Sequence, residues 1–357
     1  MITIDLHDYP IYVGPCIARI REWTTGDHYS RIFVLVDSNT RNHCLPVVEP
    51  FLPVGRYSVV EVAAGEVHKN IDTCQRIWTS LMDLRADRSA LVLNLGGGVL
   101  GDMGGFCAST FKRGIDFIQI PTTLLAQVDA SIGGKLGIDF GQVKNSIGLF
   151  RNPQAVVADP VFFQTLPPRE LRSGFAEVIK HSLIASTTQW EHIQEVTDLD
   201  TVDWSALVAP SLEIKRDIVA SDPYEKGLRK ALNFGHTVGH ALESRALETD
   251  VPLLHGEAIA AGMICEAYLS HREMGLPAEE LEKISRFLVR MYQPPTVDEV
   301  HFDFLLSLMH NDKKNRGTDI NFSLLPAAGA VVTDQTCSPE SILDSLRYLN
   351  TCSTSLE

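Results

Sequence analysis

The sequence contains no Cys-x-x-Cys pair, and its seven cysteines are scattered along 357 residues. An odd, scattered set favours reduced thiols over a disulfide framework, and a thiolate zinc site would need closely spaced pairs. No apolar run approaches the ~20 residues that a membrane-spanning helix needs. The N-terminus also lacks a basic segment followed by an apolar one, so we expect no signal peptide. These absences predict a soluble, cytoplasmic protein.

Basic residues are outnumbered by acidic ones, because 31 lysines and arginines face 45 aspartates and glutamates, a formal net charge of −14. A surface of this sign repels nucleic acid phosphates and anionic lipids, so we expect neither nucleic acid nor membrane as a partner. If the substrate is itself an anion, lysines and arginines must cluster at the site to reverse the local field.

The chain is long enough for two domains, and its 45% hydrophobic and 21% charged residues are typical of a globular protein. The first half contains short apolar segments typical of buried parallel strands, and a helical pattern at 70–84 lies among them. The segments are 31–37, 57–62, 89–95 and 117–120. Strands separated by helical stretches imply a mostly parallel sheet.

After about residue 167, helical periodicity takes over and only a weak strand signal remains, at 320–325. The helical segments are 170–184, 206–220, 232–247, 257–272 and 278–291. The tail after about residue 350 is polar, and we expect it to fray. We therefore predict an α/β protein in which residues 1–167 form a Rossmann-like domain with a mostly parallel sheet. Residues 168–357 are expected to form a mainly α-helical domain.

A glycine-rich turn, Asn94-Leu-Gly-Gly-Gly-Val-Leu-Gly-Asp102, follows the third expected strand and opens a helix. It matches Gly-x-Gly-x-x-Gly through Gly96, Gly98 and Gly101. Glycines let the backbone approach a pyrophosphate, and a helix N-terminus offers free N–H groups and a favourable dipole. Taken alone, such a turn can also simply pack a helix on a sheet, so the strand before it and the helix after it carry the nucleotide prediction.

The acid that ordinary dinucleotide folds place ~20 residues after the glycines is not clearly present. A better candidate for the ribose is Asp37, at the end of an earlier strand, with Asn39 beside it. Glu66 and Lys69 also follow a strand end and could reach the adenosine side. The nucleotide is therefore expected to lie across strand ends in a non-standard order.

The stretch 109–146 combines small residues, paired threonines and a Gly-Gly-Lys sequence. A loop that closes over a phosphate needs a flexible backbone, N–H donors and a point cation. A solvated loop is the alternative, but the density of functional side chains in an acidic protein favours anion binding. These side chains are Thr122, Thr123, Asp129, Lys135, Lys144 and Asn145.

His236 and His240 are spaced i, i+4 on an expected helix, so both rings project from one face. The spacing suits zinc, but the glutamate of His-Glu-x-x-His is missing, which disfavours a metalloprotease. His255 lies just downstream, and Glu177 offers a carboxylate on another helix. A catalytic zinc commonly takes two histidines and one carboxylate. The residues alone leave two choices, His236 with His240 or His236 with His255.

Four further polar residues, Lys215, Glu225, Arg229 and Asn233, precede this histidine pair. Arg229 and Asn233 are spaced i, i+4, so on a continuous helix they share the histidine-bearing face. A face with this composition is too polar for a core, and near a metal it is expected to line a cavity.

Several long motifs give the sequence its resemblance to the 3-dehydroquinate synthase family of sugar-phosphate cyclases. The resemblance runs through nearly the whole chain, and motifs of this length in this order are very specific. They are Gly-Gly-Gly-Val-Leu-Gly-Asp (96–102), the run from Pro121 to Lys135, Lys-Asn-Ser-Ile-Gly (144–148), Ala-Glu-Val-Ile-Lys (176–180), the run from Gly227 to Glu243, His-Gly-Glu-Ala (255–258) and Asp-Lys-Lys (312–314).

The resemblance implies a bound NAD, a catalytic Zn²⁺ (with Co²⁺ as a substitute) and a homodimer. It implies conversion of the phosphorylated sugar acid 3-deoxy-D-arabino-heptulosonate 7-phosphate to 3-dehydroquinate and phosphate. The implied route is oxidation at C5 by NAD, β-elimination of phosphate, re-reduction, ring opening and intramolecular aldol closure. The substrate phosphate can take the proton itself, so no strong protein base is needed.

Carried over by position, the resemblance assigns a role to each matching residue. The metal ligands are Glu177, His236 and His255. The phosphate contacts are Lys135, Asn145, His240 and Lys313 (in preference to Lys314), with Arg113 reaching in from the partner subunit. Lys215 and Arg229 hold the substrate carboxylate, and Asp129, Lys180, Glu225 and Asn233 surround the hydroxyls. The NAD site comprises Asp37, Asn39, Glu66, Lys69, Gly97, Gly98, Val99, Asp102, Thr122, Thr123, Lys135, Lys144 and Thr165.

Three rivals are weighed against this interpretation. Other sugar-phosphate cyclases act on substrates without the carboxylate, where Lys215 and Arg229 would be left unpaired at a cost. A metal-dependent polyol dehydrogenase would need no phosphate cluster and would release NADH. A non-catalytic NAD-binding regulator would have no use for the metal ligands.

Overall fold

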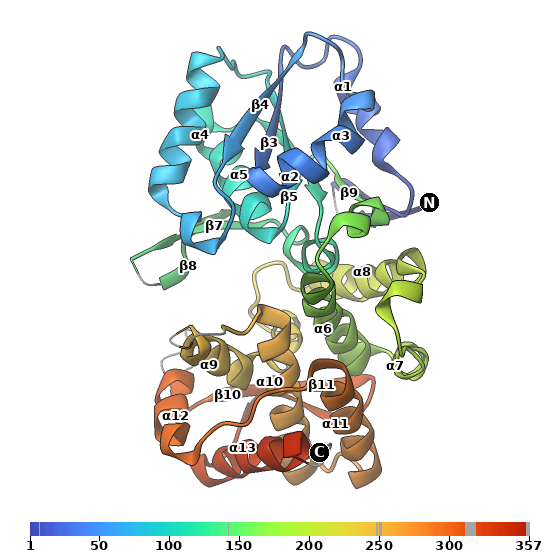
Figure 1. Cartoon of the computed structure of the whole chain (residues 1–357), viewed down its shortest axis with the longest axis vertical. Helices are drawn as coiled ribbons and strands as arrows, with labels where there is room; N and C mark the ends of the chain where they lie inside the picture. The colour runs from blue at the N-terminus through green and yellow to red at the C-terminus, as the bar shows by residue number, and fades with distance from the viewer. Residues whose placement is uncertain (7, 142, 248, 250–251, 311–318, 355–357) are drawn as a thin grey trace. The chain divides into compact units, whose positions relative to one another are not determined.

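The computed structural model describes residues 1–6, 8–141, 143–247, 249, 252–310 and 319–354 (Figure 1). It divides into two compact units. The first comprises Met1–Leu171 and Asp203–Arg216, and the second comprises Arg172–Val202 and Asp217–Glu357. The boundaries fall inside two helices, α6 (Pro168–Ala185) and α8 (Trp204–Ser221).

The first unit is built on a seven-stranded sheet with the order β1-β2-β9-β6-β5-β3-β4. Its strands are β1 (Ile2–Leu6), β2 (Tyr9–Val13), β3 (Ile32–Asp37), β4 (Tyr57–Val62), β5 (Leu91–Gly96), β6 (Asp116–Pro121) and β9 (Val156–Ala158). Only the β1–β2 pair is antiparallel within this sheet. The predicted mostly parallel sheet is confirmed, and the strands β3 to β6 lie where the apolar segments predicted them.

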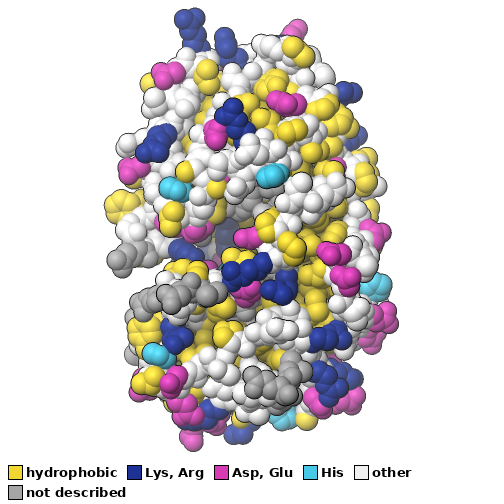
Figure 2. Space-filling view, viewed as in Figure 1, with side chains coloured by type: hydrophobic (Ala, Val, Ile, Leu, Met, Phe, Trp, Pro, Cys, Tyr) yellow, Lys and Arg dark blue, Asp and Glu magenta, His cyan; other side chains and the backbone are white. Residues whose placement is uncertain are grey.

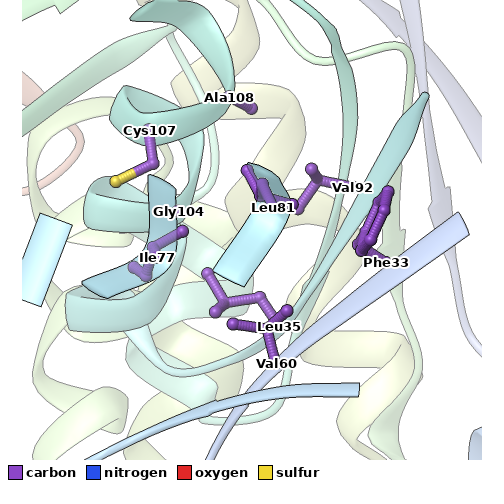
Figure 3. A pocket seen from close by; sticks show the side chains of 9 residues that line it. All are labelled: Phe33, Leu35, Val60, Ile77, Leu81, Val92, Gly104, Cys107 and Ala108. Atoms are coloured by element: carbon purple, nitrogen blue, oxygen red, sulfur yellow. The ribbon is translucent and has the colours of Figure 1, made fainter. Parts of the chain in front are cut away.

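Helices cover both faces of this sheet, which explains why its central strands are apolar on both sides. Phe33, Leu35 and Val92 face α4 (Ile71–Asp83) and α5 (Gly98–Thr110), while Val34 and Leu93 face the opposite side. The opposite side carries α1 (Arg21–Thr24), α2 (Ser38–His43) and α3 (Leu45–Val48). A small apolar cavity remains between the sheet and α4 and α5, and Figure 3 shows the side chains that line it.

The strands β7 (Lys135–Phe140) and β8 (Val143–Phe150) form an antiparallel hairpin, where the sequence predicted a loop. Nearly every side chain of β8 is exposed. A strand with no buried face has no alternation of apolar and polar residues, and this alternation is the signal by which strands are predicted. Gly137 pairs with Gly148, where a Cβ would lie 2.4 Å from the Leu136 carbonyl oxygen.

The second unit is mainly helical, as predicted. Beyond its share of α6 and α8 it contains α7 (Thr187–Gln194), α9 (His236–Ala246), α10 (His255–Leu269), α11 (Ala278–Tyr292), α12 (Phe302–His310) and α13 (Pro339–Thr354), with one antiparallel pair, β10 (Asn321–Ala327) and β11 (Ala330–Thr336). The fraying expected after residue 350 is contradicted as far as Thr354, because α13 continues to that residue; positions 355–357 lie outside the described residues.

Short helical turns connect these elements in both units. They are the 3₁₀ turns η1 (Ile17–Ile20), η2 (Glu49–Phe51), η3 (Glu66–His68), η4 (Phe111–Arg113), η6 (Pro160–Thr165), η7 (Leu199–Thr201), η8 (Leu228–Asn233) and η10 (Glu299–His301), and the π-helical turns η5 (Ala126–Ala130) and η9 (Ser270–Met274). No helix in the described part of the chain is long and apolar enough to cross a membrane. Acidic and basic side chains are interspersed on the face in Figure 2.

Helices α9 and α10 pack with their backbones in close contact, and glycines make this approach possible. A Cβ on Gly262 would lie 2.0 Å from the Gly235 carbonyl oxygen and 2.6 Å from the Gly239 nitrogen. Gly235 itself has φ +80°, and a Cβ there would lie 2.5 Å from Met263 Cγ. Because α9 begins with His236 and α10 with His255, this contact sets the distance between the two histidines.

Replacing Gly262 with alanine should therefore lower the unfolding free energy by about 3 kcal/mol, since the new methyl meets backbone that cannot rotate away. Chemical denaturation measures the loss. Gly275→Ala is the control, because Gly275 has φ +76° but open space around its Cβ. It should cost only the backbone strain of about 1–2 kcal/mol. Equal losses for the two variants would contradict the proposed steric contact.

Candidate metal centre and neighbouring sites

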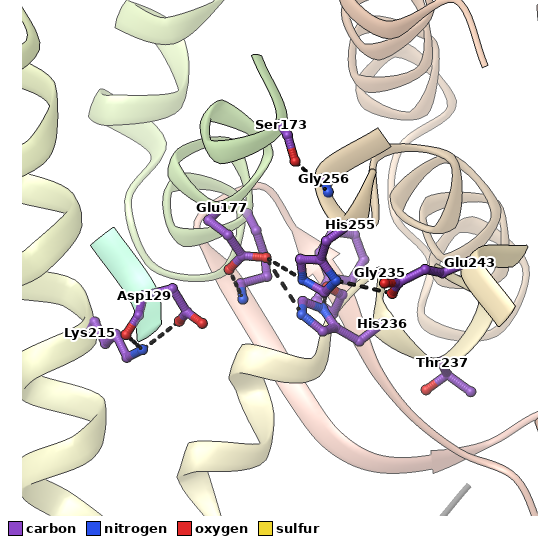
Figure 4. Close-up of polar contacts among 12 residues, drawn as sticks. Asp129, Ser173, Glu177, Lys215, Gly235, His236, Thr237, Glu243, His255 and Gly256 are labelled. Atoms are coloured by element: carbon purple, nitrogen blue, oxygen red, sulfur yellow. Dashed lines mark hydrogen bonds and ion pairs between the residues drawn. The ribbon is translucent and has the colours of Figure 1, made fainter. Parts of the chain in front are cut away.

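Three side chains that could bind a metal converge in the second unit: Glu177, His236 and His255 (Figure 4). Glu177 lies on α6, and His236 and His255 are the first residues of α9 and α10. The backbone of the first residue of a helix is fixed by the helical turns that follow it. Its side chain points toward the N-terminus, away from those turns. The three helices thus deliver one potential ligand each.

The geometry of these atoms suits a divalent cation. Glu177 Oε1 lies 3.5 Å from His236 Nε2 and 3.8 Å from His255 Nε2. Ligands held about 2.1 Å from a tetrahedral metal lie about 3.4 Å from one another. The histidine rings are 5.4 Å apart between centroids. The observed spacing therefore needs little adjustment to close around an ion.

Both histidines have their other ring nitrogen already engaged. His236 Nδ1 is 3.1 Å from the Phe234 carbonyl oxygen, and His255 Nδ1 is 3.2 Å from Glu243 Oε2. Each acceptor fixes the proton on Nδ1 and leaves the Nε2 lone pair directed at Glu177, as in metal-bound histidines. Burial alone would lower the pKa of His255, but the hydrogen bond and charge of Glu243, with Glu177, raise it.

Glu177 supplies an oxygen that fits such an ion. Its side chain is completely buried. Oε2 pairs with the equally buried ammonium of Lys180, whereas Oε1 accepts no hydrogen bond from the described residues. A buried carboxylate oxygen without a donor costs free energy, and a cation between it and the two Nε2 atoms would remove that cost.

His240, the other histidine left open by the sequence, lies one turn along α9. Its ring centroid is 5.2 Å from that of His236 and 5.9 Å from that of His255. It also comes within metal-ligand spacing of Glu243 and His255. In this second group His255 Nδ1 faces Glu243 and is already engaged with it, whereas His255 Nε2 faces Glu177. The Glu177 group is therefore the better candidate for the metal ligands.

Sequence reasoning gave Glu243 no role, although it was part of a motif. It lies three residues after His240 on α9, so the two share a helix face. That spacing is the signal which could have marked it as a partner for a histidine ligand.

The expectation that Arg229 and Asn233 share a helix face with the histidines was wrong. They lie on η8, and Gly235 in the left-handed conformation separates this turn from α9. Asn233 Nδ2 instead donates to Glu225 Oε1 at 3.1 Å. The buried Arg229 donates from its side chain to the Pro223 carbonyl oxygen at 2.6 Å. The break was missed because helical periodicity can continue through a 3₁₀ turn for one or two residues.

Asp222 organises the loop that carries these residues. Its Oδ1 accepts from the Lys226 N–H at 2.9 Å, and Oδ2 accepts from Gly227 and Arg229 N–H groups at 2.6 and 3.1 Å. Despite some burial, these hydrogen bonds hold the pKa of Asp222 below its ordinary value. The loop conformation therefore depends on an ionised carboxylate.

In the first unit, Lys69 joins two residues predicted at the nucleotide and phosphate sites. Its buried ammonium donates to Asp102 Oδ2 at 2.7 Å and to Asn145 Oδ1 at 2.6 Å. Asn145 has φ +51° and its N–H donates to Asp139 Oδ1. Burial alone would lower the pKa of Lys69, but Asp102 and Glu66 outweigh it and raise the pKa. The lysine thus stays charged and ties the hairpin to α5.

The predicted glycine turn is a strand-to-helix junction, as expected. Gly97 precedes α5, and no side chain in the described part of the chain caps the first N–H groups of this helix. A Cβ on Gly97 would lie 3.2 Å from Thr123 Cγ2, and one on Gly98 would lie 3.1 Å from Ala130 Cβ. The turn therefore leaves helix N–H groups available to an anion and lies against the segment that follows β6.

Asp37, the ribose candidate, caps α2. Its Oδ1 accepts from the Asn39 and Thr40 N–H groups at 2.9 and 2.8 Å. Asp37 could cap α2 and also bind the ribose, because both cap hydrogen bonds use Oδ1. In the described part of the chain, no hydrogen bond of this cap uses Oδ2.

The structure places the remaining predicted residues as follows. Lys215 Nζ pairs with Asp129 Oδ1 at 2.5 Å and also with its carbonyl oxygen, so these two predicted residues lie together. Lys135 and Lys144 are exposed on the hairpin, and Arg113 is exposed in η4 with φ +72°. Thr122 is buried after β6, Glu66 lies in η3, and Thr165 ends η6. Val99 lies in the first turn of α5, and Lys313 and Lys314 lie outside the described residues.

A mostly parallel α/β unit followed by a mainly helical unit defines the fold class of this chain. Its fold is that of 2-epi-5-epi-valiolone synthase from Streptomyces hygroscopicus, whose structure holds NAD⁺ and Zn²⁺. The two are 24% identical with a TM-score of 0.84, over 98% of this chain and 99% of that one.

Family models narrow this class. The 3-dehydroquinate synthase N-terminal model matches residues 59–173, and the C-terminal model matches residues 174–315. The 3-dehydroquinate synthase of Parabacteroides distasonis is 42% identical over 93% of this chain and 94% of its own. That of Halorhodospira halophila is 40% identical over 97% and 98%. The chain belongs to the 3-dehydroquinate synthase family, which confirms the resemblance seen in the motifs.

Replacing Lys69 with methionine should lower the unfolding free energy by about 3 kcal/mol near neutral pH, because Asp102 loses its buried partner. Lys283→Met is the control: its ion pairs with Glu279 and Glu280 are exposed, and stability should barely change. Because folding raises the pKa of Lys69 above 10.5, its contribution is complete below that pH and is lost as pH rises through the folded value. The gap between wild type and Lys69→Met should therefore narrow in alkaline denaturation series; a gap absent at pH 7 would rule the pair out as a stabilising contact.

Proposed function

We propose that the chain is a carbon–oxygen lyase that converts 3-deoxy-D-arabino-heptulosonate 7-phosphate to 3-dehydroquinate and inorganic phosphate. The observation that carries this proposal is the identity of 40–42% to two 3-dehydroquinate synthases over more than nine tenths of the chain. The convergence of Glu177, His236 and His255 supports it, since the reaction needs a metal next to an oxidisable hydroxyl.

The residues of the second unit fit a divalent metal. Glu177 Oε1 is buried with no donor among the described residues, and two histidine Nε2 atoms face it. Two histidines and one carboxylate are the ligand set of many catalytic zinc sites. We propose Glu177, His236 and His255 as the ligands of Zn²⁺, with Co²⁺ as a substitute.

The first unit fits NAD. The uncapped start of α5, after Gly97, offers N–H groups to a pyrophosphate, and Asp37 lies at the end of the neighbouring strand β3. When bound, NAD would take a hydride from the substrate C5 and later return it, while the metal would polarise the C5 oxygen. The proposed NAD contacts are Asp37, Asn39, Glu66, Lys69, Gly97, Gly98, Val99, Asp102, Thr122, Thr123, Lys135, Lys144 and Thr165.

The chain's own cations would bind and orient the substrate. We propose that Lys135, Asn145, His240 and Lys313 hold the phosphate and that Lys215 and Arg229 hold the carboxylate. Lys215 is buried beside Asp129, so its ammonium is already held by one carboxylate, and the substrate carboxylate would bind the same ammonium. Positioning of this kind lets the substrate phosphate remove the proton during elimination, which spares a protein base.

The hydroxyl groups would be oriented by a second set, Asp129, Lys180, Glu225 and Asn233. Glu225 and Asn233 already share a hydrogen bond, and Lys180 holds the Glu177 carboxylate. The proposed carboxylate contacts would favour this substrate over the carboxylate-free substrates of other cyclases, because a substrate carboxylate would add charge-assisted hydrogen bonds to Lys215 and Arg229.

We further propose that the enzyme is a cytoplasmic homodimer in which Arg113 of one copy reaches the phosphate site of the other. The exposed apolar side chains of Phe140, Val143 and Phe150 on the hairpin support an association surface. The seven free cysteines support a reducing compartment. Light scattering after size exclusion measures the mass of the assembly directly.

Incubation of the purified protein with NAD, Zn²⁺ and 3-deoxy-D-arabino-heptulosonate 7-phosphate should release phosphate and 3-dehydroquinate in equal amounts. No NADH should accumulate at 340 nm, because the hydride returns to the substrate. Net NADH from a polyol substrate would instead identify a dehydrogenase. Metal-loaded, folded protein that releases no phosphate would reject the proposal.

The two histidines left open by sequence should separate in their effects. His255→Ala should lose metal and activity together, because it removes a ligand. His240→Ala should keep the metal and lose rate by about 10²-fold or more, since it removes a charge-stabilising substrate contact. Atomic absorption measures the bound metal, and phosphate release measures the rate. The opposite pattern would assign the ligand role to His240.

A further inference from the structure

Glu266 on α10 is a buried carboxylate with three backbone donors. Its side chain is completely buried. Oε2 accepts from the Gly235 N–H at 2.6 Å, and Oε1 accepts from the Thr237 and Val238 N–H groups at 2.9 and 3.1 Å. The last two belong to the first turn of α9, where N–H groups have no partner within the helix. A carboxylate here also gains from the positive end of the helix dipole.

The Glu266 carboxylate, which lies on α10, caps the N-terminus of α9 in place of an N-cap side chain. The N-cap residue is Gly235, which has no side chain to fold back on the helix. It cannot acquire one, because a Cβ would lie 2.5 Å from Met263 Cγ and its φ is +80°. The capping oxygens are therefore supplied by α10, one turn after Met263, and the start of α9 is tied to α10 rather than to its own preceding loop.

His236 lies between two residues whose N–H groups Glu266 binds. It is the first residue of α9, and the residues immediately before and after it, Gly235 and Thr237, both donate to Glu266 (both are labelled in Figure 4). The ring is further fixed by the contact of Nδ1 with the Phe234 carbonyl oxygen. The backbone that places Nε2 opposite Glu177 is thus held on both sides by one carboxylate.

We propose that Glu266 is a positioning residue of the metal centre, which sets the affinity for the ion by fixing His236 relative to His255. Helix α10 begins with His255 and carries Glu266 eleven residues later, so one rigid element supplies one ligand and orients the other. The inference rests on the proposed metal centre at Glu177, His236 and His255. It makes the centre depend on a residue that touches neither metal nor substrate.

The test is the dissociation constant of Zn²⁺ for the full chain, measured by competition with a chromophoric chelator. Glu266→Gln keeps the size of the side chain but turns an –NH₂ group toward backbone donors. We expect the dissociation constant to rise 10- to 100-fold, as for other residues that orient a metal ligand. The Co²⁺-substituted protein should show altered d–d absorption bands, because the angle at His236 changes.

Ser270→Ala is the matched control for a merely structural role. Ser270 is the first residue of η9, directly after α10, and it is fully buried. It donates to the Glu266 carbonyl oxygen at 2.6 Å and accepts from the Leu325 N–H at 2.9 Å. Its loss should lower the melting temperature but leave the Zn²⁺ dissociation constant within about twofold and the Co²⁺ bands unchanged. If Ser270→Ala weakened metal binding as much as Glu266→Gln, affinity would follow general stability and the inference would fail.

The remaining outcomes are also decisive. If Glu266→Gln does not fold, Glu266→Asp keeps the charge and withdraws it by one methylene, and we expect an intermediate rise in the dissociation constant. A folded Gln or Asp variant that binds Zn²⁺ as tightly as wild type overturns the role of Glu266. Two results would overturn the proposed metal centre instead. The wild-type protein binds no Zn²⁺, or the His255→Ala variant binds Zn²⁺ as tightly as the wild type.

Discussion

The second unit is organised around the Glu177 carboxylate, which is buried so completely that its charge must be matched inside the protein. Lys180 matches one oxygen from the next turn of α6. The other oxygen faces two histidines whose outer nitrogens are held by Phe234 and Glu243. This second oxygen is buried without a hydrogen-bond donor among the described residues, and a bound cation would remove the cost of leaving it unsatisfied. The helices α6, α9 and α10 meet at this point, so their packing and the chemistry of the cluster cannot be separated.

The first unit solves the same electrostatic problem with residues far apart in sequence. Lys69 contacts Asp102 on α5 and Asn145 on the hairpin, which are 33 and 76 positions away. Lys215 contacts Asp129 across 86 positions. In a chain of net charge −14 each of these lysines is paired with an individual carboxylate, and each pair fixes an element to its neighbour.

Much of the fold followed from the sequence, because buried parallel strands such as 32–37 and 91–96 are continuous apolar runs and amphipathic helices such as α11 are periodic. The hairpin did not follow, since β8 exposes both faces and carries no such pattern. The break at Gly235 could not be seen in the sequence, because the polar residues of η8 and α9 together follow helical spacing. Glu177, His236 and His255 could be named from motifs, and the structure brings them together. Glu243 and Glu266 could not, because their roles arise from which helix packs on which, and a single sequence does not reveal that.

The burial of α10 has a consequence for how this protein can vary. From Gly256 to Ala267 every residue of this helix is buried, whereas α11 buries one face and exposes the other. An amphipathic helix can accept changes on its outer face and so accumulate neutral variants, while α10 has no outer face on which to do so. Its sequence of small residues, with glycines at 256 and 262, also leaves no volume for larger ones. Laboratory evolution toward a new substrate would therefore have to proceed around α10, through the loops and helices that it supports.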